Sequence, residues 1–232
     1  MARRSGSRNR LRLAGALLLL AAIAGGWGWW DWRHWQPPRE VYAVQGVEIG
    51  AGDGTVDWKA MKAIGADFAY INATAGAFAR DPAFVRNLDL ATKAGLQTGA
   101  VHRFDPCQPA DRQAANFVTL APRDASMLPP AVELDQLADD CPVAVPDAAV
   151  ESELMTFLNQ IETHTGKPAI LKISSSFESR YRLAKGINRN LWLARDRFQP
   201  DYAGRPWTMW TANSALMNPA EPEPLRWVVV QP

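Results

Sequence analysis

Motifs for metal, nucleotide and redox chemistry are missing from the sequence. It has no G-x-x-x-x-G-K-[ST], no C-x-x-C and no H-E-x-x-H, the patterns typical of phosphate loops, redox or zinc sites and zinc proteases. Its three histidines lie far apart in the chain, which argues against a zinc site. We therefore expect neither a bound metal nor another cofactor.

Net charge is also small, at +1, but it is unevenly distributed. Residues 1–33 contain six arginines and one acidic residue, whereas the remainder carries 19 basic and 23 acidic side chains. A mildly acidic domain argues against nucleic acid as its main partner. With 232 residues, 47% of them apolar, the chain is long enough for one well-cored domain and a tail.

An apolar stretch runs from Leu13 to Trp30 and follows five arginines. Its length is near the lower limit for crossing a bilayer. Positive charge before the stretch keeps that end in the cytoplasm, and the tryptophans at its end resemble an aromatic belt at the outer interface. We predict a single-pass, N-in anchor in a bacterial inner membrane and an exported periplasmic domain. The alternative is a signal peptide cleaved after Ala22-Ile23-Ala24 and secretion of the domain.

Two prolines in residues 36–40 predict a stiff linker after the anchor. The predicted domains are therefore residues 1–40, comprising the basic tail, the anchor and the linker, and residues 41–232, the exported domain.

From Val41 onward, short apolar runs alternate with helical patterns. Strands are predicted at residues 43–49, 67–72, 97–103, 130–135, 169–173, 191–195, 207–211 and 226–231. Helices are predicted at residues 57–64, 82–94, 109–120, 147–165 and 176–185. Five strand–helix units are followed by three strands, an order that implies parallel strands and right-handed crossovers. Eight strands predict a closed α/β barrel with an irregular last part and an active site at the C-terminal ends of the strands.

Acidic residues interrupt the apolar run of the fourth predicted strand, in the stretch LPPAVELD at residues 128–135. Residues two apart in a strand project to the same side, so Glu133 and Asp135 face the same way. Taken alone, this pattern also fits a strand end whose acids lie in solvent. Three other predicted strands place polar side chains at the same end of the barrel, namely Glu48, Asn72 and His102. This gathering favours an active site.

The two cysteines and the late tryptophans add further candidates. Cys107 follows the third predicted strand and Cys141 the fourth, so their loops are neighbours. Two cysteines in an exported domain favour a disulfide over a metal site.

Tryptophans on the last three predicted strands are core residues by default, but one or two at the barrel mouth would be able to stack on a sugar ring. Trp192 and Trp210 are the candidates.

Six segments occur in the order that is typical of one enzyme family. They are GVEIGAGDGTVDW (46–58), DFAYINATAG (67–76), AGLQTGAVHRF (94–104), LPPAVELD (128–135), KPAILKIS (167–174) and LWLAR (191–195). They resemble motifs of the glycoside hydrolase family 25 lysozymes, the Chalaropsis-type muramidases. The resemblance implies an irregular TIM-like (β/α)5β3 barrel. It also implies cleavage of the β-1,4 bond between N-acetylmuramic acid and N-acetylglucosamine in peptidoglycan, with retention of configuration.

The resemblance assigns roles to the acids. Asp135 occupies the family's proton-donor position, Glu133 that of the assisting carboxylate, and Glu48 that of the first-strand acid. The family has aspartate at the position of Glu48, and aspartate then glutamate where this chain has Glu133 then Asp135. Asn72 stands in place of a lysine. The implied substrate-binding residues are His102, Asn72, Trp192 and Trp210.

The sequence is consistent with two functions of different classes, an enzyme and a binding protein. The first is a membrane-anchored muramidase that acts on periplasmic peptidoglycan. The second is a catalytically weak barrel that binds glycan strands or scaffolds envelope proteins. The retained acids and His102 favour the first, whereas Asn72, Ala75 in place of a glutamate, and a missing D-x-N segment favour the second. We place the hydrolase first.

Overall fold

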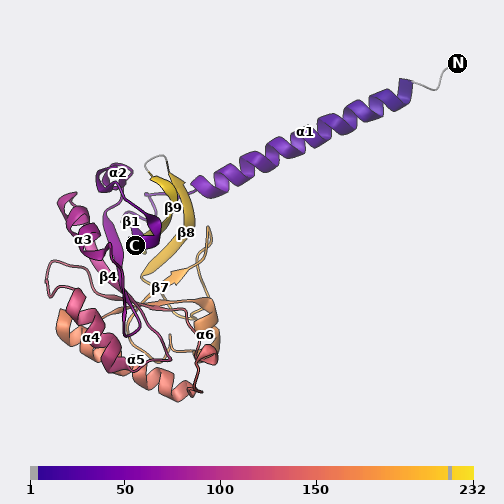
Figure 1. Cartoon of the computed structure of the whole chain (residues 1–232). Helices are drawn as coiled ribbons and strands as arrows, with labels where there is room; N and C mark the ends of the chain where they lie inside the picture. The colour runs from indigo at the N-terminus through magenta and orange to yellow at the C-terminus, as the bar shows by residue number, and fades with distance from the viewer. Residues whose placement is uncertain (1–4, 219–220) are drawn as a thin grey trace. The chain divides into compact units, whose positions relative to one another are not determined.

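The computed structural model describes residues 5–218 and 221–232 and divides the chain into two compact units, Met1–Trp35 and Gln36–Pro232. The first unit contains helix α1 (Ser5–His34), drawn in indigo in Figure 1. Leucine and alanine, which are strong helix formers, fill its middle turns. Among the described residues, α1 is the one helix that is long and apolar enough to cross a membrane, over Arg12–His34.

The segment predicted as a linker is instead part of the second unit. Pro37 is buried, and its carbonyl oxygen accepts a hydrogen bond from the side-chain amide of Gln45 at 3.0 Å. The carbonyl oxygen of Pro38 accepts from the backbone N–H groups of Val41 and Tyr42. The prediction of a stiff spacer over residues 36–40 is therefore wrong, because these contacts fold the segment against the barrel.

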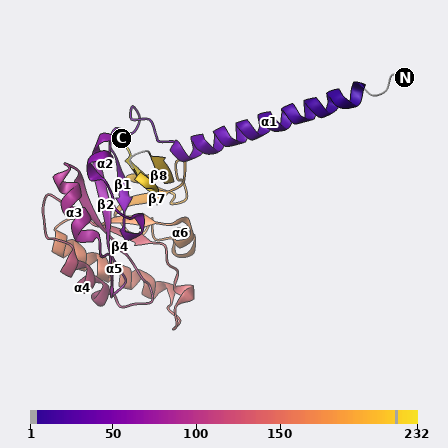
Figure 2. The ribbon, with the colours of Figure 1, turned by 45° about the horizontal axis from the view of Figure 1, so that its top comes forward.

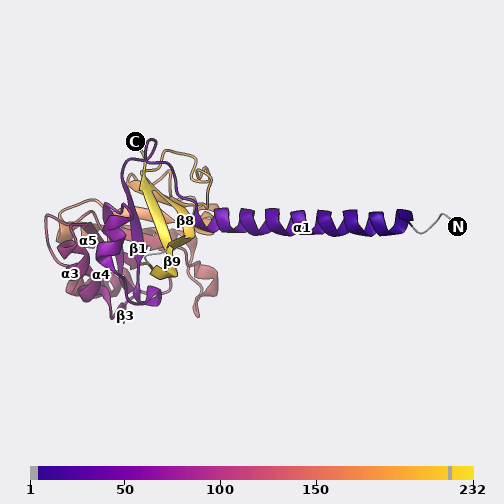
Figure 3. The same ribbon diagram turned by 90° about the horizontal axis from the view of Figure 1, so that it is seen from above.

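Eight strands form the predicted closed barrel, which Figure 2 shows from a second direction. Strands β1 to β8, apart from the short β3, run parallel to their neighbours, and β9 closes the barrel antiparallel to both β8 and β1. The yellow β8–β9 pair lies beside β1 in Figure 3. The barrel strands are β1 (Gln45–Ile49), β2 (Phe68–Ala75), β4 (Gln97–Arg103), β5 (Ala131–Leu134), β6 (Ile170–Ile173), β7 (Asn190–Ala194), β8 (Met209–Asn218) and β9 (Glu221–Val230).

Five helices follow the first five barrel strands, so the (β/α)5β3 order is confirmed. They are α2 (Trp58–Ala63), α3 (Phe84–Lys93), α4 (Ala110–Leu120), α5 (Asp147–Thr165) and α6 (Ser175–Tyr181). Asp57 caps α2, accepting the N–H groups of Lys59 and Ala60, and α5 ends at the left-handed Gly166. Helix α6 ends earlier than predicted, because Arg182 adopts a left-handed conformation with φ of 55°.

Three short elements were not predicted from the sequence. Strand β3 (Ala79–Arg80) pairs with the end of β2 as a hairpin. The 3-10 helix η1 (Ala51–Asp53) follows β1, and η2 (Ala138–Asp140) follows β5. Each is only two or three residues long, too short for a periodic pattern to reveal.

The barrel interior is filled by side chains at alternate strand positions. This core cluster consists of Phe68, Tyr70, Val101, Ala131, Ile170, Trp192, Met209 and Val228. Since side chains alternate along a strand, residues two positions further along point into the same interior. That rule decides which polar side chains reach the site at the C-terminal ends of the strands.

We expect Gly46→Ala to destabilise the seam between β1 and β2. A Cβ atom at Gly46 would lie 2.3 Å from the carbonyl oxygen of Phe68 and 2.6 Å from its ring, so both strands would have to shift. Overpacking of this kind costs about 1–3 kcal/mol, which urea denaturation would measure. Gly52→Ala is the matched control, because nothing lies within 4 Å of its added Cβ. Equal stability of the two variants would contradict the tight seam.

Candidate active site

A cleft of about 290 Å³ opens at the C-terminal ends of the strands. Its walls come from η1, β2, the β2–β3 hairpin, β4 and β5. Polar side chains in the lining are Asn72, Thr74, Arg80, Asp81, Arg103 and Glu133. This is the end of the barrel at which such folds carry their active sites.

Lys172 of β6 joins two of the predicted catalytic acids. Its Nζ atom lies 2.6 and 2.7 Å from the two carboxylate oxygens of Glu48 and 2.6 Å from Oε1 of Glu133. The side chains of Glu48, Lys172 and Glu133 are 1%, 12% and 22% exposed. Strand alternation explains the meeting: Ala131 and Ile170 belong to the barrel core, so Glu133 and Lys172, two positions later, face the same interior.

The ammonium group of Lys172 is held in its charged form. Burial lowers the pKa of Lys172, but the attraction of Glu48 and Glu133 outweighs burial and raises the pKa above its ordinary value. The ammonium also lies 5.2 Å from the ring centroid of Trp192, a favourable cation–π arrangement. Such pairing compensates for the cost of burying the charges.

A second cation flanks Glu48. Arg226 of β9 approaches Glu48, with 3.7 Å between Nε and Oε2, and binds Asp53 of η1 through Nη2 and Oδ2 at 2.6 Å. Burial lowers the pKa of Arg226, but Glu48 and Asp53 outweigh burial and raise it. Arg226 therefore ties the closing strand to the loop after β1.

Asp135 lies just past the end of β5 and pairs with Arg103 of β4. The distance from Nε of Arg103 to Oδ1 of Asp135 is 2.8 Å, and the two side chains are 51% and 33% exposed. The hydrogen bond to Asp135 is the main cause that raises the pKa of Arg103. The site thus contains three predicted acids, each facing a cation.

The family model of Glycosyl hydrolases family 25 matches residues 47–216. The chain belongs to glycosyl hydrolases family 25. Membership in this family agrees with the barrel and with the acids at its mouth.

Two solved structures and one sequence relative are similar to this family 25 chain. A family 25 glycosyl hydrolase from Bacillus anthracis superposes with a TM-score of 0.77 at 24% identity, covering 85% of this chain and 92% of that one. A lysozyme from Streptomyces coelicolor gives a TM-score of 0.70 at 20% identity, covering 81% and 91%. The Escherichia coli (strain K12) protein YegX is 26% identical over 176 residues, 73% of this chain. The chain spans 62% of the length of YegX.

His102 does not reach the cleft of this family 25 barrel. Val101 faces the interior, so His102 points outward to the helices, where it is fully buried with its ring 4.4 Å from that of Phe157. Burial lowers the pKa of His102 to about 4, against a smaller opposing effect of Gln113, so the ring is neutral near pH 7. The prediction that His102 contacts substrate is wrong for this structure.

The network around His102 fixes its tautomer. Oε1 of Gln113 accepts the N–H of Asp105 at 2.9 Å, so the same oxygen also serves as the acceptor for Nε2 of His102 at 3.2 Å. Nδ1 is then left to accept the hydroxyl of Thr74 at 2.7 Å. His102 therefore links β2 and β4 to the start of α4 and supports the cleft from behind.

The two predicted stacking tryptophans are also buried. Trp192 is 0% exposed and donates a hydrogen bond to Thr211, and Lys172 lies over its ring. Trp210, on the outer side of β8, is 2% exposed and packs against Tyr42. Neither offers a face to a sugar ring, so both predictions are wrong for this structure. Asn72 does line the cleft.

Sequence reasoning missed the three cations that face the predicted acids. Lys172 carried a usable signal, because it is a lysine inside an apolar strand, two residues after the inward Ile170. Arg103 follows the outward His102 and therefore faces inward. Arg226 carried a similar signal, because it lies beside an apolar run, two residues before the inward Val228, although its partner Asp53 lies 173 residues away.

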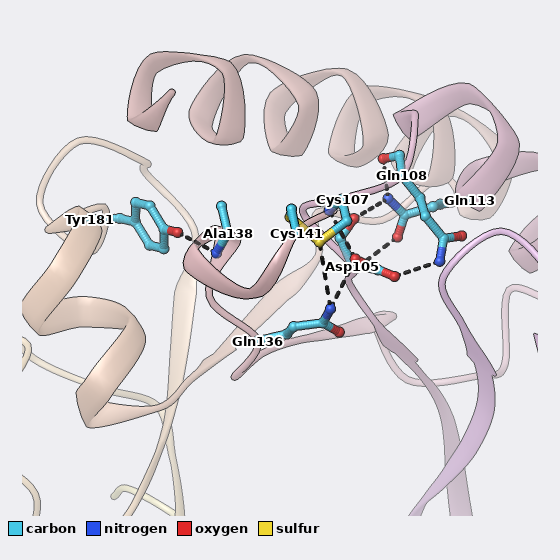
Figure 4. The surroundings of a disulfide bond; sticks show 8 residues. All are labelled: Asp105, Cys107, Gln108, Gln113, Gln136, Ala138, Cys141 and Tyr181. Carbon is cyan, nitrogen blue, oxygen red and sulfur yellow. Dashed lines mark hydrogen bonds between the residues drawn. A yellow bond between two sulfur atoms is a disulfide. The ribbon is translucent and has the colours of Figure 1, made fainter. Parts of the chain in front are cut away.

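A disulfide joins the loops after β4 and β5, as predicted. Cys107 and Cys141 are bonded, with 5.2 Å between their Cα atoms. Figure 4 shows Asp105 beside it, accepting hydrogen bonds from the backbone N–H of Cys107 and from the side chains of Gln108 and Gln136. Gln136 directly follows Asp135, so this network anchors the loop that carries the predicted proton donor.

In the described part of the chain, no group of three His, Cys, Asp or Glu side chains is placed to hold a metal ion.

Replacing both cysteines with serine should lower the free energy of unfolding by about 3–4 kcal/mol, the value that the loop-entropy model gives for cysteines 34 residues apart. Urea denaturation of the oxidised protein and the variant would measure the difference. Cys107→Ser alone should lose the same amount, because one cysteine cannot form the bond. An unchanged stability in both variants would show that the disulfide does not restrain the loops.

Proposed function

We propose that this family 25 glycosidase cleaves the β-1,4 bond between N-acetylmuramic acid and N-acetylglucosamine in peptidoglycan, with retention of configuration. The observation that carries the proposal is the gathering of acids at the C-terminal end of the barrel: Glu48 and Glu133 meet at Lys172, Glu133 lines the cleft, and Asp135 pairs with Arg103 of the cleft lining. Retaining glycosidases need one protonated carboxyl group and a second group that stabilises the developing positive charge. The strand-end acids supply both.

The arrangement supports distinct roles for the acids. Asp135, the more exposed, donates its proton to the glycosidic oxygen as the bond to C1 of the muramic acid residue breaks. Glu133 faces the cleft and stabilises the positive charge that develops at C1. Asp135 then takes a proton from the water that attacks C1, which restores the acid and leaves a hydroxyl group there.

The pairing of Asp135 with Arg103 is compatible with this role. A solvent-exposed ion pair is worth about 0–1 kcal/mol, and half of the Arg103 side chain is exposed. An incoming sugar therefore separates the pair at little cost, and Asp135 becomes free to hold a proton.

A second function is favoured by one specific observation. All three acids face cations, since Glu48 and Glu133 share Lys172 and Asp135 contacts Arg103. A cleft whose acids are neutralised in this way is suited to bind glycan strands without cleaving them. In this alternative the barrel is a binding module or a scaffold for envelope proteins.

We further propose that α1 anchors the protein in a bacterial inner membrane with the barrel in the periplasm. The length and composition of Arg12–His34 support a membrane span, and the arginines that precede it support an N-in orientation. Cleavage as a signal peptide remains the alternative, and it would release the same domain.

Asp135→Asn should reduce the release of reducing ends from purified peptidoglycan by at least about 10²-fold, the usual contribution of a general acid. The amide keeps the shape of the side chain but has no proton to transfer. Binding to sedimented peptidoglycan should persist, because the cleft is unchanged. Asp111→Asn, on the exposed surface of α4, is the control and should behave as wild type. Wild-type protein that binds peptidoglycan but releases no reducing ends would favour the binding module.

A reporter enzyme that works only in the periplasm should be active when it is fused after Pro232, and one that works only in the cytoplasm should be inactive. The expected orientation follows from the positive charge before α1. Immunoblotting and N-terminal sequencing of the membrane fraction would show whether the anchor is retained. Reporter activity in the cytoplasm, or a mature chain that begins near Gly25, would contradict the anchor.

A further inference from the structure

The cluster of Glu48, Lys172 and Glu133 has one ammonium group for two carboxylates. Because that ammonium contacts both acids, their nearest oxygens lie within roughly 5 Å, a separation at which like charges disfavour ionisation of both groups. Glu48 is 1% exposed and Glu133 22%, so water screens their repulsion weakly. Without the ammonium, the repulsion between the two carboxylates would have no counter-charge between them.

No other described cation is placed to replace Lys172. Arg226 is 3.7 Å from Glu48 and is bound to Asp53, and Arg103 attracts Glu133 but is bound to Asp135. Tyr202, from the segment between β7 and β8, is within electrostatic range of Lys172, but its hydroxyl donates to the carbonyl oxygen of Ile173. The charged and titratable groups that face the cluster are thus Arg226, Asp53, Arg103, Asp135 and Tyr202. Arg226 attracts Glu133 as well as Glu48, but of these groups none has a described hydrogen bond to either acid, whereas Lys172 binds both.

Building on the glycosidase function proposed above, we propose that Lys172 is a positioning residue that holds Glu48 and Glu133 side by side and ionised, so that Asp135 carries the transferable proton. The ammonium divides the three acids into a fixed anionic pair and one acid outside it. Glu133 then presents a constant negative charge to the sugar. The cation–π contact with Trp192 and the raised pKa of Lys172 keep the ammonium in place and charged.

The first test measures proton uptake without relying on catalysis. Lys172→Met removes the charge and keeps an unbranched side chain of similar length. The native acid pair of the variant should then bind a proton that the unfolded chain does not bind, so the native state gains stability as the pH falls. The thermal midpoint of the full-length variant in mild detergent should be furthest below wild type at about pH 8. The deficit should shrink by about 1–3 °C at about pH 5, because one unit of raised proton affinity is worth about 3–5 °C in a domain of this size only once the pH falls below the ordinary pKa of glutamate.

Two further variants make this test specific. Lys172→Met combined with Glu133→Gln leaves a single carboxylate that keeps Arg226 at 3.7 Å, so its deficit relative to wild type should change with pH less than that of Lys172→Met. Lys62→Met removes an exposed lysine from α2 and should follow wild type throughout. A pH-independent deficit in Lys172→Met, or the same pH dependence in the double variant, would overturn the assignment.

The second test uses hydrolysis. In Lys172→Met the acidic limb of the pH–activity profile on peptidoglycan should move to higher pH by about one unit, because protonation of the pair removes the counter-charge. An unshifted limb in an active, folded variant would also overturn the assignment. If the wild-type protein releases no reducing ends, the glycosidase proposal fails by itself, and the thermal measurements still decide the role of Lys172.

Discussion

Barrel closure by β9 is the constraint on which the site depends. β9 lies between β8 and β1 and runs antiparallel to both, and this closes the ring that begins with β1. Only a closed ring brings Lys172 of β6 to Glu48 of β1, across 124 residues of sequence. Arg226, carried by β9 itself, then reaches Asp53 and Glu48. The disulfide restrains the loops on the other side of the cleft, where Asp135 lies.

Much of this architecture could be predicted from the sequence, because local signals and the global fold agree. The alternation of apolar runs and helical patterns predicted the (β/α)5β3 order, and the capping residues Asp57 and Gly166 lie at ends of two predicted helices. The prolines of residues 36–40 led to a wrong prediction, because the stiffness of a proline-containing segment does not determine whether that segment packs against the barrel. Only the tertiary contact from Gln45 shows that this segment belongs to the barrel.

Side-chain direction separates the predicted site residues that reach the barrel mouth from those that do not. Glu48, Asn72 and Glu133 lie at inward positions, and all three reach the barrel mouth. His102 lies near the C-terminal end of its strand, but its side chain points outward, into the layer between the strands and the helices. Trp192 faces inward, but the ammonium group of Lys172 lies over its ring. Alternation along a strand shows which side chains share a face. The register of each strand is also needed to tell which face points inward, and the sequence does not give that register.

The central claim is that the acids at the barrel mouth cleave glycan strands with retention, despite the cations beside them. The most direct measurement is proton NMR of the first products formed by the full-length protein from soluble peptidoglycan strands, followed by borohydride reduction and sugar analysis. Hydrolysis with retention at this bond predicts that the new anomeric centre appears first in the β configuration and that reduction converts muramic acid, not glucosamine, to its alcohol. Reduced glucosamine, a product that appears first as the α anomer, or bound but uncleaved strands would contradict it.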